Sequence, residues 1–360
     1  MSFAVLALLL LPGSFSASGQ DPDSARLRFS VSLSGPGAED PATQQNVIDV
    51  YKQRLGKRAE GASFAAQPED RALTIELGLR AAFDSAGSAK LGKDVSIDAQ
   101  AVDLEGDMEL PEFGVLFVDR EWLSFRNTKG PTLNLLKRGL WETSASAHAA
   151  GTSVELFNIR PMSILLETRG DLAFLQGASR EFLKSHDTDP DAEETRLRSW
   201  MEAHPNAAIS ELDSVPREKG GPLPGTIWRP HHDGALKLLR LPADESVQFT
   251  RDDIVKWGLK KDYDGQHALT FSFSSARAEA FSTWTEKIKG SAMAVLLDDT
   301  ILTYATVRSR LPAEGEFGGG TVGRTKSETS ALLHVLHAPV LKVCAKVSGM
   351  QFVQETGANK

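Results

Sequence analysis

The sequence has little of several features that would place a protein in a particular class. Cys344 is the only cysteine among 360 residues, so no disulfide can form within the chain; its apolar neighbours predict a small buried side chain. No Lys- or Arg-rich run is present, and 40 basic against 48 acidic residues give a net charge of −8. Because phosphate binding needs clustered cations, we expect no nucleic-acid partner.

Long hydrophobic runs are also scarce. Residues 1–19 are apolar from Phe3 to Leu11 and continue with Pro, Gly and small residues. This pattern is typical of a secretory signal peptide, with residues 16–18 as the cleavage site, and the run is too short to span a bilayer. We therefore predict an exported protein, in the periplasm or cell envelope, with no integral membrane span in the mature chain.

One glycine motif suggests a cofactor, but its surroundings argue against one. Gly318, Gly320 and Gly323 fit G-x-G-x-x-G, which binds a dinucleotide only between a buried strand and the start of a helix. The preceding segment is charged and contains Pro312, and the next helix begins only after Thr325. These glycines predict a tight turn or bulge that leads into a strand, and no cofactor.

Other polar groups have structural interpretations, and we predict no catalytic, cofactor-binding or metal-binding residues. The chain has no G-x-S-x-G elbow and no H-E-x-x-H motif, which argues against two common hydrolase classes. The groups considered are a helical histidine pair without a third ligand (His334, His337), an exposed loop (His231, His232, Asp233), a turn histidine (His148), a hairpin turn (Asp298, Asp299) and one exposed strand face (Asp103, Glu105, Asp107, Glu109).

Hydrophobic periodicity divides the first two thirds of the chain into three parts. Residues 26–79 predict strand, helix, strand and strand, with Gly56 closing the helix. Residues 95–157 lose helical periodicity and predict a compact all-β module. Residues 163–176 predict a strand, 184–204 a charged helix whose Trp200 and Met201 reach a core, and the Pro- and Gly-rich residues 213–242 a linker.

The last third has the clearest pattern. Residues 267–273 alternate as a strand, and an apolar stripe from Ala278 to Ile288 predicts a helix. Residues 292–297 and 301–307 predict a hairpin. Thr325 and Glu328 form a capping box that opens a helix, which is followed by a strand over 340–347. The predicted order is β-α-β-β-β-α-β, with both helices on one face of a sheet.

This last third resembles the head of the large periplasmic domain of the protein-export subunit SecD. The resemblance covers residues 243–347, with a helical Phe281, the strand end Val295–Asp298, a glycine-containing strand at 320–324 and a helix at 328–336. The N-terminal part, through residues 46–77 and 165–176, is similar to the base of the same domain. Residues 95–157 resemble a small β module of phage-tail and related surface proteins, which would then be an insertion.

Together these features predict an α+β protein with ferredoxin-like, SecD-like base and head domains and an all-β insertion. The expected boundaries are a signal peptide (1–19), a base (25–90 with 160–212), the inserted module (95–157), a linker (213–242), a head (243–349) and a tail (350–360). The resemblance implies a non-enzymatic exported protein that binds polypeptide or a translocon partner. The alternative is an envelope or surface interaction protein whose β insertion carries the binding. The oligomeric state stays open.

Overall fold

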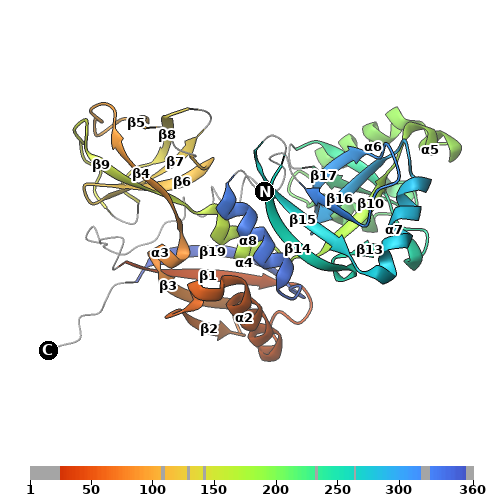
Figure 1. Cartoon of the computed structure of the whole chain (residues 1–360), viewed down its shortest axis with the longest axis horizontal. Coiled ribbons are helices and arrows are strands. Elements are labelled where there is room, and N and C mark those ends of the chain that lie inside the picture. Colours follow the sequence, from red (N-terminus) through yellow and green to blue (C-terminus); the bar gives the residue numbers. More distant parts are fainter. Residues whose placement is uncertain are drawn as a thin grey trace. The chain divides into compact units, whose positions relative to one another are not determined.

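The computed structural model describes residues 25–106, 110–127, 130–140, 143–231, 234–262, 265–317 and 325–353. The chain forms two compact units: unit 1 is Met1–Arg169 with Gly323–Lys360, and unit 2 is Gly170–Val322. The fold is α+β, as predicted (Figure 1). The predicted signal peptide at 1–19 and the glycine motif at 318–323 lie outside the described residues.

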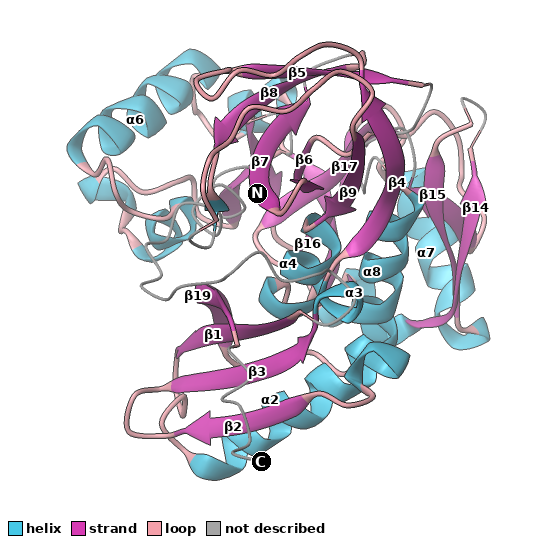
Figure 2. Cartoon of the chain, turned by 90° about the vertical axis from the view of Figure 1, so that its left-hand side faces the viewer, coloured by secondary structure: helices cyan, strands magenta, loops and turns pink. Residues whose placement is uncertain are grey.

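Unit 1 contains a four-stranded antiparallel sheet in the order β19-β1-β3-β2. Its strands are β1 (Arg26–Ser34), β2 (Ser63–Gln67), β3 (Ala72–Gly78) and β19 (Cys344–Phe352). The helices α2 (Pro41–Leu55), α4 (Arg160–Glu167) and α8 (Lys326–His337) pack against one another on this sheet (Figure 2). The predicted strand, helix, strand and strand of the N-terminal part are confirmed.

Local sequence explains these first elements. In β1, the side chains of Leu27, Phe29 and Val31 are fully buried while the intervening residues reach solvent, as expected for a strand with one buried face. Asp40 caps α2 by accepting hydrogen bonds from the amides of Ala42 and Thr43, which satisfies donors that the helix leaves free.

The C-terminal helix and strand lie in a different domain from the one predicted. Residues 326–349 were expected in the head (243–349) and the following residues in the tail (350–360), but β19 pairs with β1 along its length, from Leu27↔Phe352 to Ser34↔Cys344. Alternating apolar residues predict that a segment is a strand without specifying its partner. The prediction failed because this partner lies at the opposite end of the sequence.

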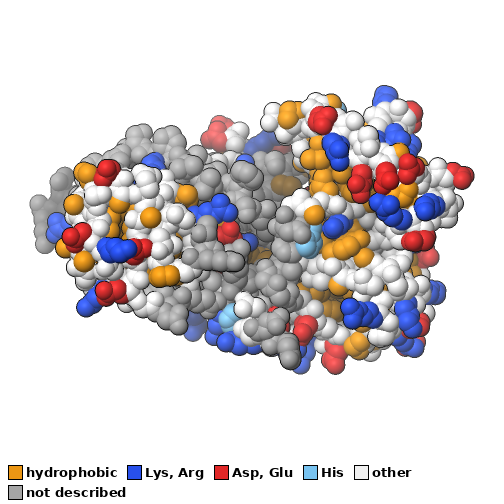
Figure 3. All heavy atoms as spheres, turned by 90° about the horizontal axis from the view of Figure 1, so that it is seen from above, with side chains coloured by type: hydrophobic (Ala, Val, Ile, Leu, Met, Phe, Trp, Pro, Cys, Tyr) orange, Lys and Arg blue, Asp and Glu red, His pale blue; other side chains and the backbone are white. Residues whose placement is uncertain are grey.

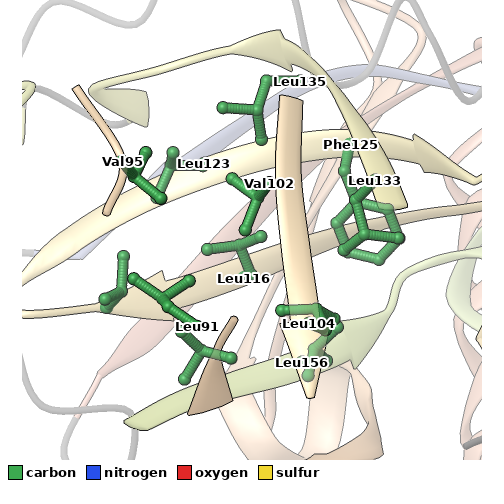
Figure 4. Close-up of a cluster of buried hydrophobic side chains, with 12 residues drawn as sticks. Leu91, Val95, Val102, Leu104, Leu116, Leu123, Phe125, Leu133, Leu135 and Leu156 are labelled. Atoms are coloured by element: carbon green, nitrogen blue, oxygen red, sulfur yellow. The ribbon is translucent and has the colours of Figure 1, made fainter. Parts of the chain in front are cut away.

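Between α3 (Leu79–Ala82) and α4, unit 1 contains a closed β-barrel in the order β4-β5-β8-β7-β6-β9. The strands are β4 (Asp84–Leu91), β5 (Ala101–Glu105), β6 (Phe113–Val118), β7 (Glu121–Asn127), β8 (Thr132–Lys137) and β9 (Ser153–Asn158). Their inward-facing aliphatic side chains and Phe125 fill the interior (Figure 4). The barrel begins earlier than residue 95, because β4, predicted within the base segment 25–90, is one of its strands.

Unit 2 contains two sheets. The larger has the order β11-β12-β10-β16-β17, with β13 also paired to β10, and the smaller has the order β14-β15-β18. The strands are β10 (Leu172–Gly177), β11 (Thr226–Pro230), β12 (Leu236–Arg240), β13 (Phe249–Thr250), β14 (Ile254–Lys261), β15 (His267–Phe273), β16 (Ala292–Leu297), β17 (Thr300–Thr306) and β18 (Glu314–Phe317). The helices are α5 (Arg180–Ser185), α6 (Pro190–Ala203) and α7 (Ser275–Lys287).

Unit 2 confirms four predicted elements: β15, α7, β16 and β17. It corrects their arrangement, because β15 and β16 belong to different sheets and α8 belongs to unit 1. The predicted linker 213–242 contains β11 and β12, and Leu239 within it is fully buried. Residues 170–212, placed with the base from sequence, also lie in unit 2.

Two local predictions in the middle of the chain are also wrong. The first part of the expected strand 163–176 is the helix α4, so only β10 is extended. In the expected helix 184–204, the chain breaks before Pro190, which starts α6. Trp200 is buried as expected, but the side chain of Met201 is 44% exposed.

Candidate functional site

A groove of about 380 Å³ opens on unit 2 between a strand, a loop and a helix. The strand β10 contributes Phe174, Leu175 and Gln176. The remaining lining comes from the end of β12 with the loop that follows it (Arg240, Leu241, Pro242, Ala243, Asp244, Val247) and from the end of α7 (Trp284, Lys287, Ile288). The lining contains no hydroxyl, thiol or imidazole side chain.

The groove exists because the sheet is interrupted beside β10. One edge of β10 pairs with β16, and the other pairs first with β13 (Phe174↔Phe249) and then with β12 (Gln176↔Arg240). The segment 241–248 therefore leaves this edge after Arg240 and returns at Phe249. Pro242 cannot donate to a strand ladder, and Asp244 caps a 3-10 turn over Glu245–Val247. Both features keep this loop out of the sheet.

A cluster of aromatic rings lies beneath the groove. The ring centroid of Phe174 is 5.3 Å from that of Phe273 and 5.6 Å from that of Phe281. The ring of Phe249 lies 5.3 Å from those of both Phe281 and Trp284. These five side chains are buried. Dense aromatic packing of this kind fixes the floor in one shape, so the groove is preformed.

Charged groups form the rim. Arg240 donates a hydrogen bond to Gln176 Oε1 (2.9 Å), and its guanidinium carbon lies 4.2 Å from the ring centroid of Phe182. Burial lowers the pKa of Arg240. The hydroxyl and amide of Ser246 hold the pKa of Asp244 below its usual value, and the charge of Lys287 acts in the same direction. The groove thus combines an apolar floor with a charged rim.

The connection between the units is held firmly on each side. In unit 1, the buried Arg54 donates hydrogen bonds to the carbonyls of Leu165 (3.0 Å) and Arg169 (2.6 Å), at the end of α4. In unit 2, Asp298 Oδ1 accepts from the amides of Gly170 and Asp171, each at 3.0 Å. One peptide group, between residues 169 and 170, thus has its carbonyl bound within unit 1 and its amide bound within unit 2.

The barrel contains a buried ionic cluster around Glu121. The side chains of Glu121 and His148 are each 1% exposed, and that of Arg138 is 10% exposed. Glu121 accepts from Arg138 Nε (3.0 Å) and Nη2 (2.8 Å), and its Oε2 lies 2.8 Å from His148 Nε2. The other ring nitrogen of His148 lies 3.1 Å from Asp119. His148 was predicted to have a structural role. In the structure it belongs to this cluster, whose members bond one another and the adjacent backbone.

A second cavity, of about 480 Å³, lies in unit 1 near the start of α8. Its lining is mostly polar (Arg58, Asp84, Ser85, Ala86, Pro111, Asn158, Thr325, Lys326, Ser327, Ser330). Arg58 pairs with Asp84 at 2.5 Å, and Asn158 Nδ2 donates to Thr325 Oγ1 and to Glu328 Oε1. These bonds join the end of the barrel to α8, so the groups serve the fold.

The structure places the other sequence candidates apart from the groove. His334 bonds the carbonyl of Arg54 through Nδ1 (2.9 Å), while His337 is exposed. His231 follows β11 and bridges to Ile301; His232 and Asp233 lie outside the described residues. Within the described part of the chain, no group of three His, Cys, Asp or Glu side chains could hold a metal.

The acidic candidates and the cysteine lie in a turn or on strands. Asp298 and Asp299 form the predicted turn between β16 and β17, where Asp298 has a φ of 55°. Asp103 and Glu105 share one face of β5, and Asp107 and Glu109 lie outside the described residues. Cys344 is exposed, which corrects the predicted buried position. It begins β19 on the solvent face, whereas Ala345 and Val347 point inward.

Sequence reasoning missed the groove entirely. Its floor residues appeared only as strand and helix core positions, and Arg240 and Asp244 fell in or beside the supposed linker 213–242. On the face shown in Figure 3, positive and negative side chains of the described residues are interspersed, with apolar side chains between them.

Part of the groove lies in a segment that matches a known protein family. Residues 239–343 match the family model described as the SecDF P1 head subdomain. This segment is therefore similar to the SecDF P1 head subdomain. The match confirms the resemblance of residues 243–347 that was drawn from sequence. The P1 head segment includes the loop 241–248 and α7, which are two of the three walls of the groove.

Solved SecDF structures are similar to the whole chain at low identity. The first is SecDF in its super-membrane-facing form, with 13% identity and a TM-score of 0.36 over 97% of this chain and 33% of that chain. The second is a structure of SecDF described as a membrane component that enhances protein export, with 13% identity and a TM-score of 0.34 over 89% of this chain and 97% of that chain. The third is SecDF of Thermus thermophilus, described as a translocon-associated membrane protein, with 12% identity and a TM-score of 0.28 over 96% of this chain and 34% of that chain. The chain spans about a third of the length of the first of these. No curated protein sequence matches it. Among the described helices, none has the length and apolar character needed to cross a bilayer.

Proposed function

We propose that this chain is a non-enzymatic, extracytoplasmic protein that acts in protein export by binding unfolded polypeptide in the groove of its P1 head segment. The observation that carries the proposal is the overlap of the groove with the family match: the loop 241–248 and the end of α7 both lie within residues 239–343. A translocon component is the partner to which such a protein would deliver or yield its polypeptide.

The chemistry of the groove supports polypeptide as the ligand. Its volume of about 380 Å³ lies at the small end of the range for ligand sites, roughly 300–1,000 Å³, and suits a few side chains. The buried aromatic floor offers apolar contact, and Leu241 at the edge is 46% exposed. Apolar contact recognises unfolded segments without a fixed sequence, because folded proteins hide such side chains.

Unit 1 supports the interpretation of a SecD-like base that carries an insertion. The sequence order β1-α2-β2-β3, then α8 and β19, with sheet order β19-β1-β3-β2, is that of a ferredoxin-like β-α-β-β-α-β fold. We infer that the barrel is inserted between β3 and α4 of this base. The signal-peptide pattern of residues 1–19 favours export to the periplasm or cell envelope.

Peptide binding by groove variants tests the proposal. Fluorescence anisotropy with a labelled, capped apolar peptide should detect binding to the intact chain. Leu241→Asp, which places a charge at the groove edge, should weaken this binding about ten-fold or more. Val255→Asp is the matched control, since Val255 is 69% exposed and lies on β14, outside the groove lining. If the intact chain binds no peptide, or if both variants bind as it does, the proposal is wrong.

A competing function places the binding on the barrel, as in a surface interaction protein. The observation in its favour is that the barrel exposes two large apolar side chains, Ile97 (60%) and Leu136 (37%). The barrel is easily removed, because Asp84 and Asn158 are paired at its entry and exit. A short Gly-Ser link replacing residues 86–156 should leave peptide binding intact. Loss of every protein partner from envelope extracts, with peptide binding unchanged, would move the function to the barrel.

A further inference from the structure

Arg240 differs from two other partly buried arginines of unit 2, Arg229 and Arg277, in the groups that it contacts. Arg229 pairs with Asp213 (2.6 Å) and Asp299 (3.2 Å), and Arg277 pairs with Asp253 (3.0 Å). The contacts of the Arg240 side chain are the amide oxygen of Gln176 and the ring of Phe182. Within the described residues it forms no ion pair with a carboxylate. The groove thus has a guanidinium in its wall whose charge is not matched by an acid.

The environment of this guanidinium favours an anionic ligand. A guanidinium has five N–H donors, and the hydrogen bond to Gln176 uses Nη1 alone. Stacking over Phe182 holds the plane of the group in place. Partial burial lowers its pKa, because the charged form loses hydration. A carboxylate supplied by a ligand would restore the balance.

The remaining charges of the groove do not compete for this role. Asp244 is the single acidic residue of the lining, and its carboxylate accepts from the amide and hydroxyl of Ser246. Lys287, at the end of α7, adds a second positive charge to the wall. Trp284 on the same helix and Ile288, which follows it, are mostly buried apolar side chains that line the groove beside this charge. The groove therefore combines a cationic side with an apolar one.

We propose that Arg240 forms a carboxylate-binding subsite, so that the groove prefers an extended polypeptide segment in which an Asp or Glu side chain is adjacent to an apolar residue. This inference rests on the proposed function and specifies its ligand. The acidic side chain binds the guanidinium of Arg240, and its apolar neighbour lies on the surface formed by Trp284 and Ile288. Arg240 acts as a specificity residue, and the aromatic floor supplies contact common to all ligands.

The test compares two peptides that differ in one charge. Each is N-acetylated, C-amidated and fluorescently labelled; one contains Leu-Glu at its centre and the other contains Leu-Gln. The intact chain should bind the Leu-Glu peptide about ten-fold more tightly, because charge-assisted hydrogen bonds are roughly twice as strong as neutral ones and a ten-fold change in Kd corresponds to only about 1.4 kcal/mol. Arg240→Gln should abolish the difference in affinity between the two peptides. Arg240→Glu should instead favour a Leu-Lys peptide.

A matched control separates a local contact from a general effect of charge. Arg180→Gln makes the same change in net charge at an exposed ion pair with Asp191, outside the groove lining, and should keep the preference for Leu-Glu. Equal binding of the two peptides by the intact chain would overturn the subsite while the proposed function stands. So would an equal loss of both peptides in a folded Arg240→Gln variant. Binding of neither peptide by the intact chain would refute both proposals.

Discussion

Replacement of Glu121 by Gln tests how far the barrel depends on its buried ionic cluster. The side chain accepts five hydrogen bonds: two from Arg138, one each from the amides of Gly139 (3.2 Å) and Ser146 (3.0 Å), and one from His148 in the tautomer that places a proton on Nε2. Gln keeps the shape but removes the charge. Arg138 would remain 10% exposed with its charge unmatched by Glu121.

The magnitude follows from this burial. Removing one partner of a buried ion pair costs about 3–5 kcal/mol, because the other charge stays desolvated. Arg138 also donates to the carbonyls of Ser96 and Ser146, which places the expected cost of Glu121→Gln near the lower end, about 3 kcal/mol in the free energy of unfolding. Urea denaturation followed by far-UV circular dichroism measures it.

A double-mutant cycle makes the test specific. Arg138→Met leaves Glu121 buried and should also destabilise, and the double variant should lose less than the sum of the two, because neither charge then remains unmatched. A loss below about 1 kcal/mol for Glu121→Gln, or simple additivity, would show that the cluster is as weak as a surface pair, and the reasoning would be refuted.

Acid pH should act on the same group. Burial is the largest influence on Glu121 and acts to raise its pKa, but hydrogen bonds from Arg138, Ser146 and His148 and the charge of Arg138 together bring the pKa below the usual 4.5. Because the folded-state pKa is depressed, the stabilisation is present above pH 4.5 and disappears as the pH falls through the folded-state value. Glu121→Gln should flatten the loss of stability in this acid range relative to the unaltered chain.

Three further substitutions or modifications have sharp expectations. Gly114→Ala should destabilise the barrel by about 1–3 kcal/mol in urea denaturation, since the new Cβ would lie 2.6 Å from the carbonyl oxygen of Phe157; Gly92→Ala, with its nearest neighbour at 3.6 Å, is the control, and equal losses would contradict the packing argument. Asp298→Ala should cost about 1–3 kcal/mol, because it removes the acceptor of two amides and places Ala at a φ of 55°; Asp298→Asn should recover much of the loss. Cys344 should react with a maleimide in the folded chain at the rate of a free thiol, since its side chain is exposed, and labelling only after urea denaturation would contradict this.

Elements whose pattern is complete within a short segment could be predicted. The alternation of Leu269, Phe271 and Phe273 gave β15, and the stripe of Phe281 and Trp284 gave α7, because burial on one face leaves a period that the sequence shows directly. Asp298 gave the hairpin turn for a similar reason, since Asp tolerates positive φ.

Predictions failed where a segment depends on distant partners. The run around Ile164 and Leu165 is apolar on all sides, and such runs fit a strand or a buried helix equally well. Pro161 was the available signal, because proline favours the first turn of a helix. In the supposed linker, Pro230 ends the strand β11, which pairs with β12. The buried Ile227 and Leu239 of these strands pack against β10, β16 and β17, which lie elsewhere in the sequence.

The groove could not be predicted, because it arises where strand pairing along one edge of β10 is interrupted. Arg240 and Phe249 pair with the same strand edge, and the residues between them bulge outward. Nothing in the segment 241–248 marks it as the wall of a site, since its Pro and Asp residues are ordinary loop residues. The contacts of Arg240 are Gln176 and Phe182, and its lack of an ion pair within the described residues follows from the three-dimensional arrangement and not from its sequence neighbours.

The two units differ in how far along the chain their contacts reach, and this has a consequence for folding. Unit 2 is one continuous segment, Gly170–Val322, whereas the sheet of unit 1 joins residues as far apart as Ser30 and Ser348, separated by 318 positions. Closing so long a loop opposes folding entropically.

We expect residues 170–322 to unfold cooperatively in urea when produced alone, because their contacts are internal. Residues 25–169 alone should not, because β1 would lose β19 and become an unpaired edge. Adding residues 323–360 as a separate peptide should restore the cooperative transition of this fragment, and a fragment 25–169 that unfolds cooperatively without that peptide would show that β19 is not required for the base.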